Sequence, residues 1–234
     1  MFIKLITGAD ESHIKSLKQC IQSIIKHADN NIHLIVYDLG IKSKQLRQDI
    51  EFEISKLTFS ELRTFPFDKY PPYFNIQINA GEYAWKPTII HTVLNECNNP
   101  NEAIFWIDAG CILTNTLTDL RTELQKSNIY TPISQGTIKT WTHPKTLEHF
   151  PNIDTQAQNR AAGVFACTYT PLTIRLVNEW FKCAMNKSII APPGSSRRNH
   201  RQDQSILSIL ITKYQLNNTL NPSLINIKIH QDCD

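Results

Sequence analysis

The residues that follow one short apolar segment are the first candidates for chemistry. Residues 103–107 are apolar throughout, and the segment ends on Asp108, Ala109 and Gly110. An unbroken apolar run of this length is typical of a strand buried on both faces of a parallel sheet. Ligands of open α/β sheets bind beyond the carboxyl ends of the strands, where a carboxylate beside two small residues can hold a metal ion or a sugar hydroxyl. The alternative is that Asp108 caps the next turn, as aspartate often does.

Lys86 is a second candidate, because it lies at the predicted start of a helix. Pro87 stands where the first helical residue is expected, and apolar residues follow on one face of the helix. The helix N-terminus and the ammonium group would both favour an anion such as phosphate. The alternative is a surface lysine whose stem packs on Trp85 or Tyr83.

Asp203 and Gln204 begin a later predicted helix. From the residues alone, N-capping is the favoured interpretation of Asp203. Residues 191–202 are rich in proline, serine and basic residues and predict a loop. This loop contains three arginines, Arg197, Arg198 and Arg201. Arginine forks suit phosphate geometry, although a solvated loop would need no ligand to explain them.

The elements that must position these residues alternate between strand and helix. The start of the chain predicts a strand at 2–6, a helix capped by Ser12, a strand at 32–37, a helix within 42–56 and a strand within 57–65. This β-α-β-α-β order predicts a right-handed parallel sheet that binds a nucleotide at its strand ends. Residues 65–83 predict a surface loop packed by its own aromatic side chains. Later strands are expected at 103–107, 161–167 and 224–229, and later helices at 117–124, from Pro171 and from Asp203.

Composition narrows the class of protein. The 234 residues suit one α/β domain spanning 1–234, and the hydrophobic fraction of 41% is that of a soluble globular protein. A net charge of +3 without a long basic run argues against nucleic-acid binding. The six scattered cysteines indicate neither a disulfide framework nor a zinc site. With no signal peptide or membrane-spanning run, the default expectation is a reducing, cytoplasmic location.

Two common nucleotide-binding motifs are missing after the first strand. Neither a GxGxxG fingerprint nor a Walker A loop follows it. This argues against a dinucleotide dehydrogenase and a P-loop NTPase.

Four landmarks in this order resemble the GT-A fold of nucleotide-sugar glycosyltransferases, in particular the retaining hexosyltransferases of family 8 and their uncharacterised relatives. The landmarks are Lys86 at a helix start, the strand ending in Asp108-Ala109-Gly110, the strand containing Ala162-Gly163-Val164, and Asp203-Gln204 at a late helix start. The resemblance runs over residues 86–211, and the first strand and helix fit the family's nucleotide-binding start. It implies an α/β fold with a mostly parallel central sheet flanked by helices.

The resemblance also implies roles for single residues. Asp108 stands where the first carboxylate of the DxD motif binds Mn²⁺ or Mg²⁺ that bridges the donor diphosphate, and carboxylate oxygens suit such ions. Asp203 would bind donor hydroxyls, and Gln204 would lie near the anomeric carbon. Lys86 resembles the family's basic residue near the donor. The other positions expected to contact the donor are Thr7, Gly8, Ala9, Ala109, Gly110, Arg160, Ala162 and Gly163.

The sequence departs from the family pattern at three places. Gly110 replaces the second DxD carboxylate. Ala161 replaces the asparagine of the family's Asn-Ala-Gly strand start, and Arg160 is the candidate to supply the missing contact. His230 is the only late histidine that can serve as a metal ligand, but it lacks the family's surrounding sequence, and a solvated role is the alternative. An arginine- or lysine-based site that neutralises the diphosphate without a metal stays open.

Three functions are consistent with these patterns. The first is a glycosyltransferase that moves a hexose from a nucleotide-diphosphate sugar, expected to be UDP-linked, to a glycan or other hydroxyl acceptor with retained configuration. The second, a sugar-phosphate nucleotidyltransferase, ranks lower because residues 7–13 are not a Gly-rich basic loop. The third is a non-catalytic nucleotide-sugar or glycan-binding module with a degenerate GT-A fold, which the lost carboxylate at Gly110 favours.

Overall fold

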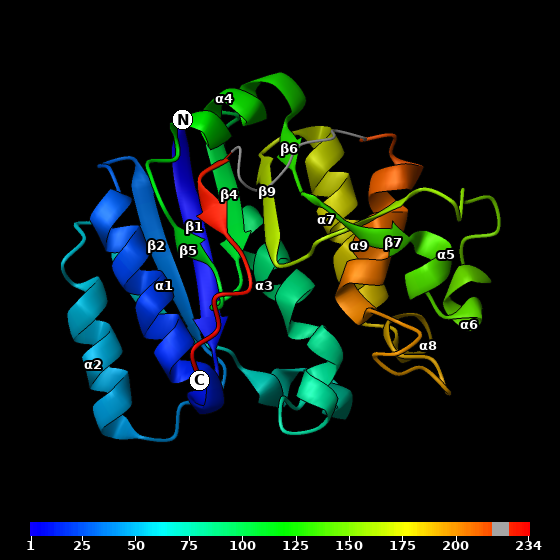
Figure 1. Cartoon of the computed structure of the whole chain (residues 1–234), viewed down its shortest axis with the longest axis horizontal. Coiled ribbons are helices and arrows are strands. Elements are labelled where there is room, and N and C mark those ends of the chain that lie inside the picture. Colours follow the sequence, from blue (N-terminus) through cyan, green and yellow to red (C-terminus); the bar gives the residue numbers. More distant parts are fainter. Residues whose placement is uncertain (217–224) are drawn as a thin grey trace.

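A six-stranded sheet forms the centre of the computed structural model, which describes residues 1–216 and 225–234 (Figure 1). The strand order is β3-β2-β1-β4-β9-β6. The first four strands along the chain run parallel: β1 (Phe2–Ala9), β2 (Ile32–Asp38), β3 (Ser60–Thr64) and β4 (Glu102–Ile107). In contrast, β9 (Val164–Thr168) pairs antiparallel with both β4 and β6 (Ile129–Tyr130). The predicted α/β class with a mostly parallel sheet is confirmed.

Helices cover both faces of this sheet (Figure 1). On one face, α1 (Ile14–His27), α2 (Lys44–Ile54) and α4 (Thr118–Ser127) contribute to one apolar core. On the other, α3 (Trp85–Leu94), α7 (Pro171–Ala184) and α9 (Gln202–Lys213) contribute to a second core. The apolar residues of β4 are fully buried between the two cores, which explains why residues 103–107 carry no alternation of polar side chains.

Two small antiparallel pairs lie beside the main sheet. One joins β5 (Ile112–Leu113) to β10 (Ile227–Lys228), and the other joins β7 (Ile133–Thr137) to β8 (Gln158–Arg160). The expected strand at 224–229 corresponds to β10, although Leu224 lies outside the described residues. The short helices α5 (Ile138–Trp141), α6 (Pro144–Leu147) and α8 (Lys187–Ile190) lie between the longer elements. Among the described residues, none of the helices has the length and apolar character needed to cross a membrane.

The aromatic segment between β3 and α3 packs on itself, as predicted. The Phe65 and Tyr70 rings stack with centroids 5.0 Å apart, and Tyr70 and Phe74 stack at 5.1 Å. Phe65 and Phe74 are buried and join the core under α3. The loop is therefore fixed against the body of the protein just before Lys86.

Two predicted boundaries were wrong. Ser12 does not cap α1, because a short turn at Glu11–His13 precedes the helix and His13 occupies the N-cap position. The strand expected at 161–167 begins at Val164, after a turn at Ala162 and Gly163. This turn lies next to the end of β4, because the backbone N–H of Asp108 donates to the Gly163 carbonyl at 2.8 Å.

Candidate functional site

A cavity of about 610 Å³ lies where β1 and β4 end and α3 and α9 begin. Most of the residues singled out from the sequence line it. They are Gly8, Ala9, Lys86, Asp108, Ala109, Gly110, Ala162, Gly163, Asp203, Gln204 and His230. Segments that are more than a hundred residues apart in the chain thus share one pocket, as the resemblance requires.

Thr7 and Arg160 do not line this cavity. The Thr7 side chain is buried, with its hydroxyl 4.0 Å from the Cys20 sulfur under α1. Arg160 is buried in β8, where its backbone N–H donates to the Ser208 hydroxyl at 2.8 Å and its guanidinium reaches the Thr131 carbonyl at 3.5 Å. The expected contact between Arg160 and a donor sugar stays a prediction.

Lys86 forms the centre of the site. Its Nζ lies 2.8 Å from Oδ1 of Asp108 and 3.3 Å from Oδ2 of Asp203. The Lys86 side chain is only 5% exposed, and α3 already begins at Trp85, so Lys86 belongs to the first helical turn. The interpretation of Lys86 as a surface lysine is wrong. A single ammonium group instead bridges two carboxylates from distant segments.

Burial and charge act in opposite directions on this cluster. Burial alone would lower the pKa of Lys86, but the attraction of Asp108 and Asp203 outweighs it and raises that pKa above its usual value. For Asp203, burial is the largest influence and raises the pKa of the carboxyl, with Lys86 opposing it and Asp108 adding to it. The ammonium group therefore stays charged, and Asp203 is the carboxyl that takes up a proton more readily than usual.

Asp108 is held at the cavity wall by contacts on its Oδ1. The Trp106 indole N–H donates to this oxygen at 2.7 Å, and Lys86 pairs with it. Oδ2 lies against Gly163, where an added Cβ would come within 2.8 Å of it. The turn after β4 is closed by the backbone, because the Cys111 N–H donates to the Asp108 carbonyl. These contacts disagree with a capping role, and 43% of the side chain stays exposed to the cavity.

Asp203 is not an N-cap either. Arg201 occupies the N-cap position of α9, and Asp203 lies inside the first turn. Its backbone carbonyl accepts from the Trp180 indole N–H at 3.0 Å, which ties this turn to α7. The N-capping interpretation is wrong because burial of Asp203 depends on a partner from α3, which the local sequence does not reveal.

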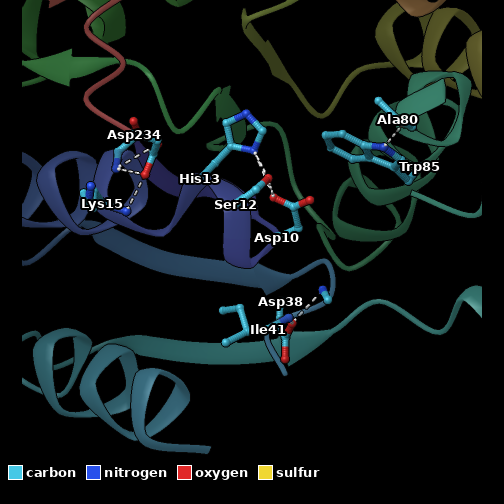
Figure 2. A network of polar contacts seen from close by, with 11 residues as sticks. Asp10, Ser12, His13, Lys15, Asp38, Ile41, Ala80, Trp85 and Asp234 are labelled. Carbon is cyan, nitrogen blue, oxygen red and sulfur yellow. Dashed lines mark hydrogen bonds and ion pairs between the residues drawn. The ribbon is translucent and has the colours of Figure 1, made fainter. Parts of the chain in front are cut away.

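The last residues of the chain form a segment, 230–234, that crosses from Gly110 to the start of α1. The Gln231 N–H donates to the Gly110 carbonyl at 2.8 Å, and the Asp234 carboxylate accepts from the Lys15 N–H at 2.8 Å (Figure 2). Between them, the Asp232 carboxylate lies where a Cβ on Gly110 would stand, 2.3 Å from that position. Asp232 lines the cavity with His230. The sequence reasoning missed Asp232, and the only signal was the absent carboxylate at Gly110.

A polar group at the end of β1 was also missed. Asp10, Ser12 and His13 line the cavity, and Oδ1 of Asp10 accepts from the Ser12 hydroxyl at 2.6 Å and lies 2.9 Å from His13 Nδ1 (Figure 2). Burial raises the pKa of Asp10, but the contacts with Ser12 and His13 outweigh it, so the net direction is down. The prediction stopped at Ala9, although the polar residues directly after it belong to the same strand end.

Residues 79–83 form an unusual wall of the cavity. Asn79, Ala80, Glu82 and Tyr83 all have positive φ, between 49° and 54°, which is the left-handed region. Gly81 also has positive φ and lies so close to the Phe74 carbonyl that a Cβ would come within 2.3 Å of it. The Trp85 indole N–H donates to the Ala80 carbonyl at 3.0 Å and holds the turn against α3 (Figure 2).

His200 anchors the loop that carries Arg197 and Arg201. It is fully buried, its Nδ1 accepts from the His143 backbone N–H at 3.3 Å, and its Nε2 lies 2.9 Å from the Ile190 carbonyl. This pattern needs a neutral ring that is protonated at Nε2 only. Burial, the largest cause, lowers the pKa of His200 to about 4.

The protonation of His200 predicts acid instability. In the unfolded chain His200 takes up a proton near pH 6.5, whereas in the folded chain it does so only near pH 4. The contribution of neutral His200 to the free energy of unfolding is therefore fully present above pH 6.5 and decreases as the pH falls from 6.5 to 4. The loss of unfolding free energy should be about 2 kcal/mol at pH 5 and about 3 kcal/mol near pH 4. Urea unfolding at pH 7, 6 and 5 measures it, with His200→Gln as the control that cannot titrate. Parallel pH profiles for the two proteins would contradict this role.

Comparison of sequences identifies a family only for the start of the chain. Residues 2–91 match a family described as protein of unknown function (DUF1647). No curated protein matches the sequence.

Comparison of folds is more informative. The bifunctional glycosyltransferase WbbM superposes with a TM-score of 0.61 and 14% identity over 94% of this chain and 39% of its own. Core-mannan synthase A (CmsA/Ktr4) from Aspergillus fumigatus, in a Mn/GDP form, superposes with a TM-score of 0.58 and 8% identity. The match covers 91% of this chain and 70% of the synthase chain. The galactosyltransferase LgtC, in complex with donor and acceptor sugar analogues, superposes with a TM-score of 0.51 and 16% identity. The match covers 97% of this chain and 86% of the LgtC chain.

The chain has the GT-A fold of nucleotide-sugar glycosyltransferases. It spans about two fifths of WbbM, so the larger part of that chain has no counterpart here. At these identities the likeness concerns the fold, and the chemistry has to be argued from the cavity.

Proposed function

We propose that this chain is a glycosyltransferase that moves a hexose from a nucleotide-diphosphate sugar, UDP-linked, to a hydroxyl of a glycan or other acceptor with retention of configuration. The observation that carries the proposal is the bridge from Lys86 to Asp108 and Asp203 within a cavity at the carboxyl ends of β1 and β4. This is the edge of an open α/β sheet where nucleotides bind. The runner-up, a binding module, would use the same cavity without turnover.

The proposed roles follow from the positions of the side chains. Gly8 and Ala9 offer a backbone without bulk at the end of β1, which suits the close approach of a nucleoside. Asp203 is buried and fixed by Lys86, so its carboxylate is oriented to accept hydrogen bonds from sugar hydroxyls. Gln204 lines the cavity next to it and is proposed to lie near the anomeric carbon. Lys86 places a fixed positive charge where the diphosphate would depart.

Mn²⁺ or Mg²⁺ is the cofactor that the fold implies, and the donor chemistry of the cavity fits it. Asp108, Asp232 and His230 line one cavity, and carboxylate oxygens with an imidazole suit these ions. The Asp232 carboxylate lies beside Gly110, so the segment 230–234 would supply the carboxylate that residue 110 lacks. Among the described residues, no three acidic, histidine or cysteine side chains are already gathered into a metal site, so these three would have to converge. A bound ion would neutralise charge on the departing diphosphate.

The role of Asp232 can be tested by metal binding alone. Asp232→Asn is expected to weaken Mn²⁺ binding by about tenfold or more, because one anionic ligand is lost. Electron paramagnetic resonance of free Mn²⁺ measures the affinity without any turnover. Asp234→Asn is the matched control, because Asp234 lies on the same segment but binds the start of α1. An unchanged affinity of Asp232→Asn would exclude Asp232 as a ligand.

The proposed function is tested by separating binding from turnover. Calorimetry with uridine, UDP and UDP-hexoses measures affinity, with and without Mn²⁺, and release of UDP in the presence of an acceptor panel measures transfer. Binding with turnover supports the transferase. Tight binding without turnover on a broad panel would favour the binding module, and no binding of any nucleotide sugar would overturn both.

A further inference from the structure

Two arginines at the edge of the cavity are held in place by aromatic rings. The Arg197 guanidinium carbon lies 5.1 Å from the centroid of the Tyr83 ring, and its Nη1 donates to the Tyr83 hydroxyl. The Arg201 guanidinium carbon lies 4.2 Å from the centroid of the Trp141 ring. A cation–π contact holds a guanidinium near the ring, and the N–H groups that the ring does not occupy can bind an oxyanion. Both arginines line the cavity.

Among the residues that the structure describes, neither arginine has an anionic partner. Across residues 1–216 and 225–234, neither Arg197 nor Arg201 forms an ion pair with a carboxylate, whereas Arg47, Arg63 and Arg121 each do. Glu82 belongs to the same turn as Tyr83, but its Oε2 accepts from the Gln202 side chain at 3.2 Å. Within the described part of the chain, both guanidinium groups therefore line the cavity without a directly paired carboxylate, although other carboxylates line the same cavity.

The charges also repel one another. Burial is the main cause that lowers the pKa of Arg201, and repulsion by Arg197 is the next. Two like charges held close together by separate aromatic rings are relieved by an anion bound between them.

Arg197 and Lys86 contact the same aromatic ring, which links the arginine pair to the bridge at Lys86. The Lys86 Nζ lies 5.9 Å from the centroid of the Tyr83 ring, which Arg197 also contacts. A group bound by Arg197 would thus lie in the same cavity as Asp108 and Asp203. We infer that Arg197 and Arg201 form a binding site for an anionic group of a substrate, a phosphate or a carboxylate.

Two sources of this anion are distinguishable: the diphosphate of the donor, and an acidic group on the transferred or accepting sugar. The site itself does not depend on the proposed transferase, whereas the choice between the two sources rests on it. The probes are pyrophosphate and UDP for the first source and glucuronate for the second, with uridine as the uncharged reference. Calorimetry at two salt concentrations measures their affinities.

The variant is Arg197→Gln combined with Arg201→Gln. Arg198→Gln is the matched control, because Arg198 belongs to the same loop but does not line the cavity. The double variant is expected to bind its anion at least about tenfold more weakly, since charge-assisted hydrogen bonds are lost, while Arg198→Gln binds like the unmodified chain. Circular dichroism and melting temperature verify that the variants are folded.

Each outcome has a distinct meaning. Weaker binding of pyrophosphate and UDP with unchanged uridine assigns the site to the donor diphosphate. Weaker binding of glucuronate alone assigns it to an acidic sugar. Equal affinities of the double variant and the unmodified chain for both probes, or no binding of either probe by the unmodified chain, would overturn the site. The test measures binding affinities and not transfer activity. A chain that binds the anion but transfers no sugar would therefore contradict the proposed transferase and leave the anion site in place.

Discussion

Replacement of Lys86 by methionine is expected to destabilise the fold by about 3–5 kcal/mol, because it leaves Asp108 and the buried Asp203 without their shared cation. Methionine keeps much of the length of the side chain, so the loss reports the charge more than the packing. The free energy of unfolding in urea at pH 7 measures it. Transfer activity should disappear together with stability.

A second substitution separates charge from structure. Asp203→Asn added to Lys86→Met removes the stranded buried carboxylate and should recover most of the lost stability, yet it should not recover transfer. Coupling of this kind is expected only for side chains in direct contact. If the two substitutions act additively on stability, the buried bridge does not exist in solution.

Asp108→Asn is expected to reduce transfer by about a hundredfold or more while changing stability little. The amide oxygen of asparagine can still accept from the Trp106 indole and from Lys86, so the side chain keeps its position and loses only its negative charge. Fixed charges at the reacting centre account for losses of this size when they are removed. Steady-state kinetics with a UDP-hexose measures the effect.

The control for Asp108 is an aspartate away from the cavity. Asp68→Asn is suitable, because Asp68 is exposed and does not line the cavity. It should transfer at the rate of the unmodified chain. Full activity of Asp108→Asn would exclude a charged role for Asp108 and would also remove the reason to expect a metal there.

The sequence predicts the end of β4 well, because this buried strand is a continuous apolar run that stops at a polar residue. Asp108 is correctly placed after β4 for this reason, and Lys86 and Asp203 are correctly placed at helix starts. The sequence does not indicate which strand ends and helix starts come into contact in the fold. Asp203 alone is a typical N-cap, and its burial becomes intelligible only when α3 brings Lys86 within 3.3 Å of it.

The positions that failed have related causes. Thr7 precedes the last residues of β1, where alternate side chains point to opposite faces, and its face is the one covered by α1. Arg160 is charged, but it is buried in β8 and is not part of the cavity lining. Asp232 lies more than a hundred residues from Gly110, and a contact of that separation leaves no local pattern.

The left-handed turn at Asn79–Tyr83 has a consequence for protein engineering. Non-glycine residues in this conformation each cost roughly 1–2 kcal/mol, and such costs concentrate where a protein binds or transforms something. Ala80→Gly or Glu82→Gly would remove this cost. A selection for thermostable variants should therefore enrich glycine at these two positions, whereas glycine usually destabilises a folded protein. The same substitutions would free the Tyr83 ring from its fixed orientation, and heat resistance gained at this rim would come with weaker ligand selection.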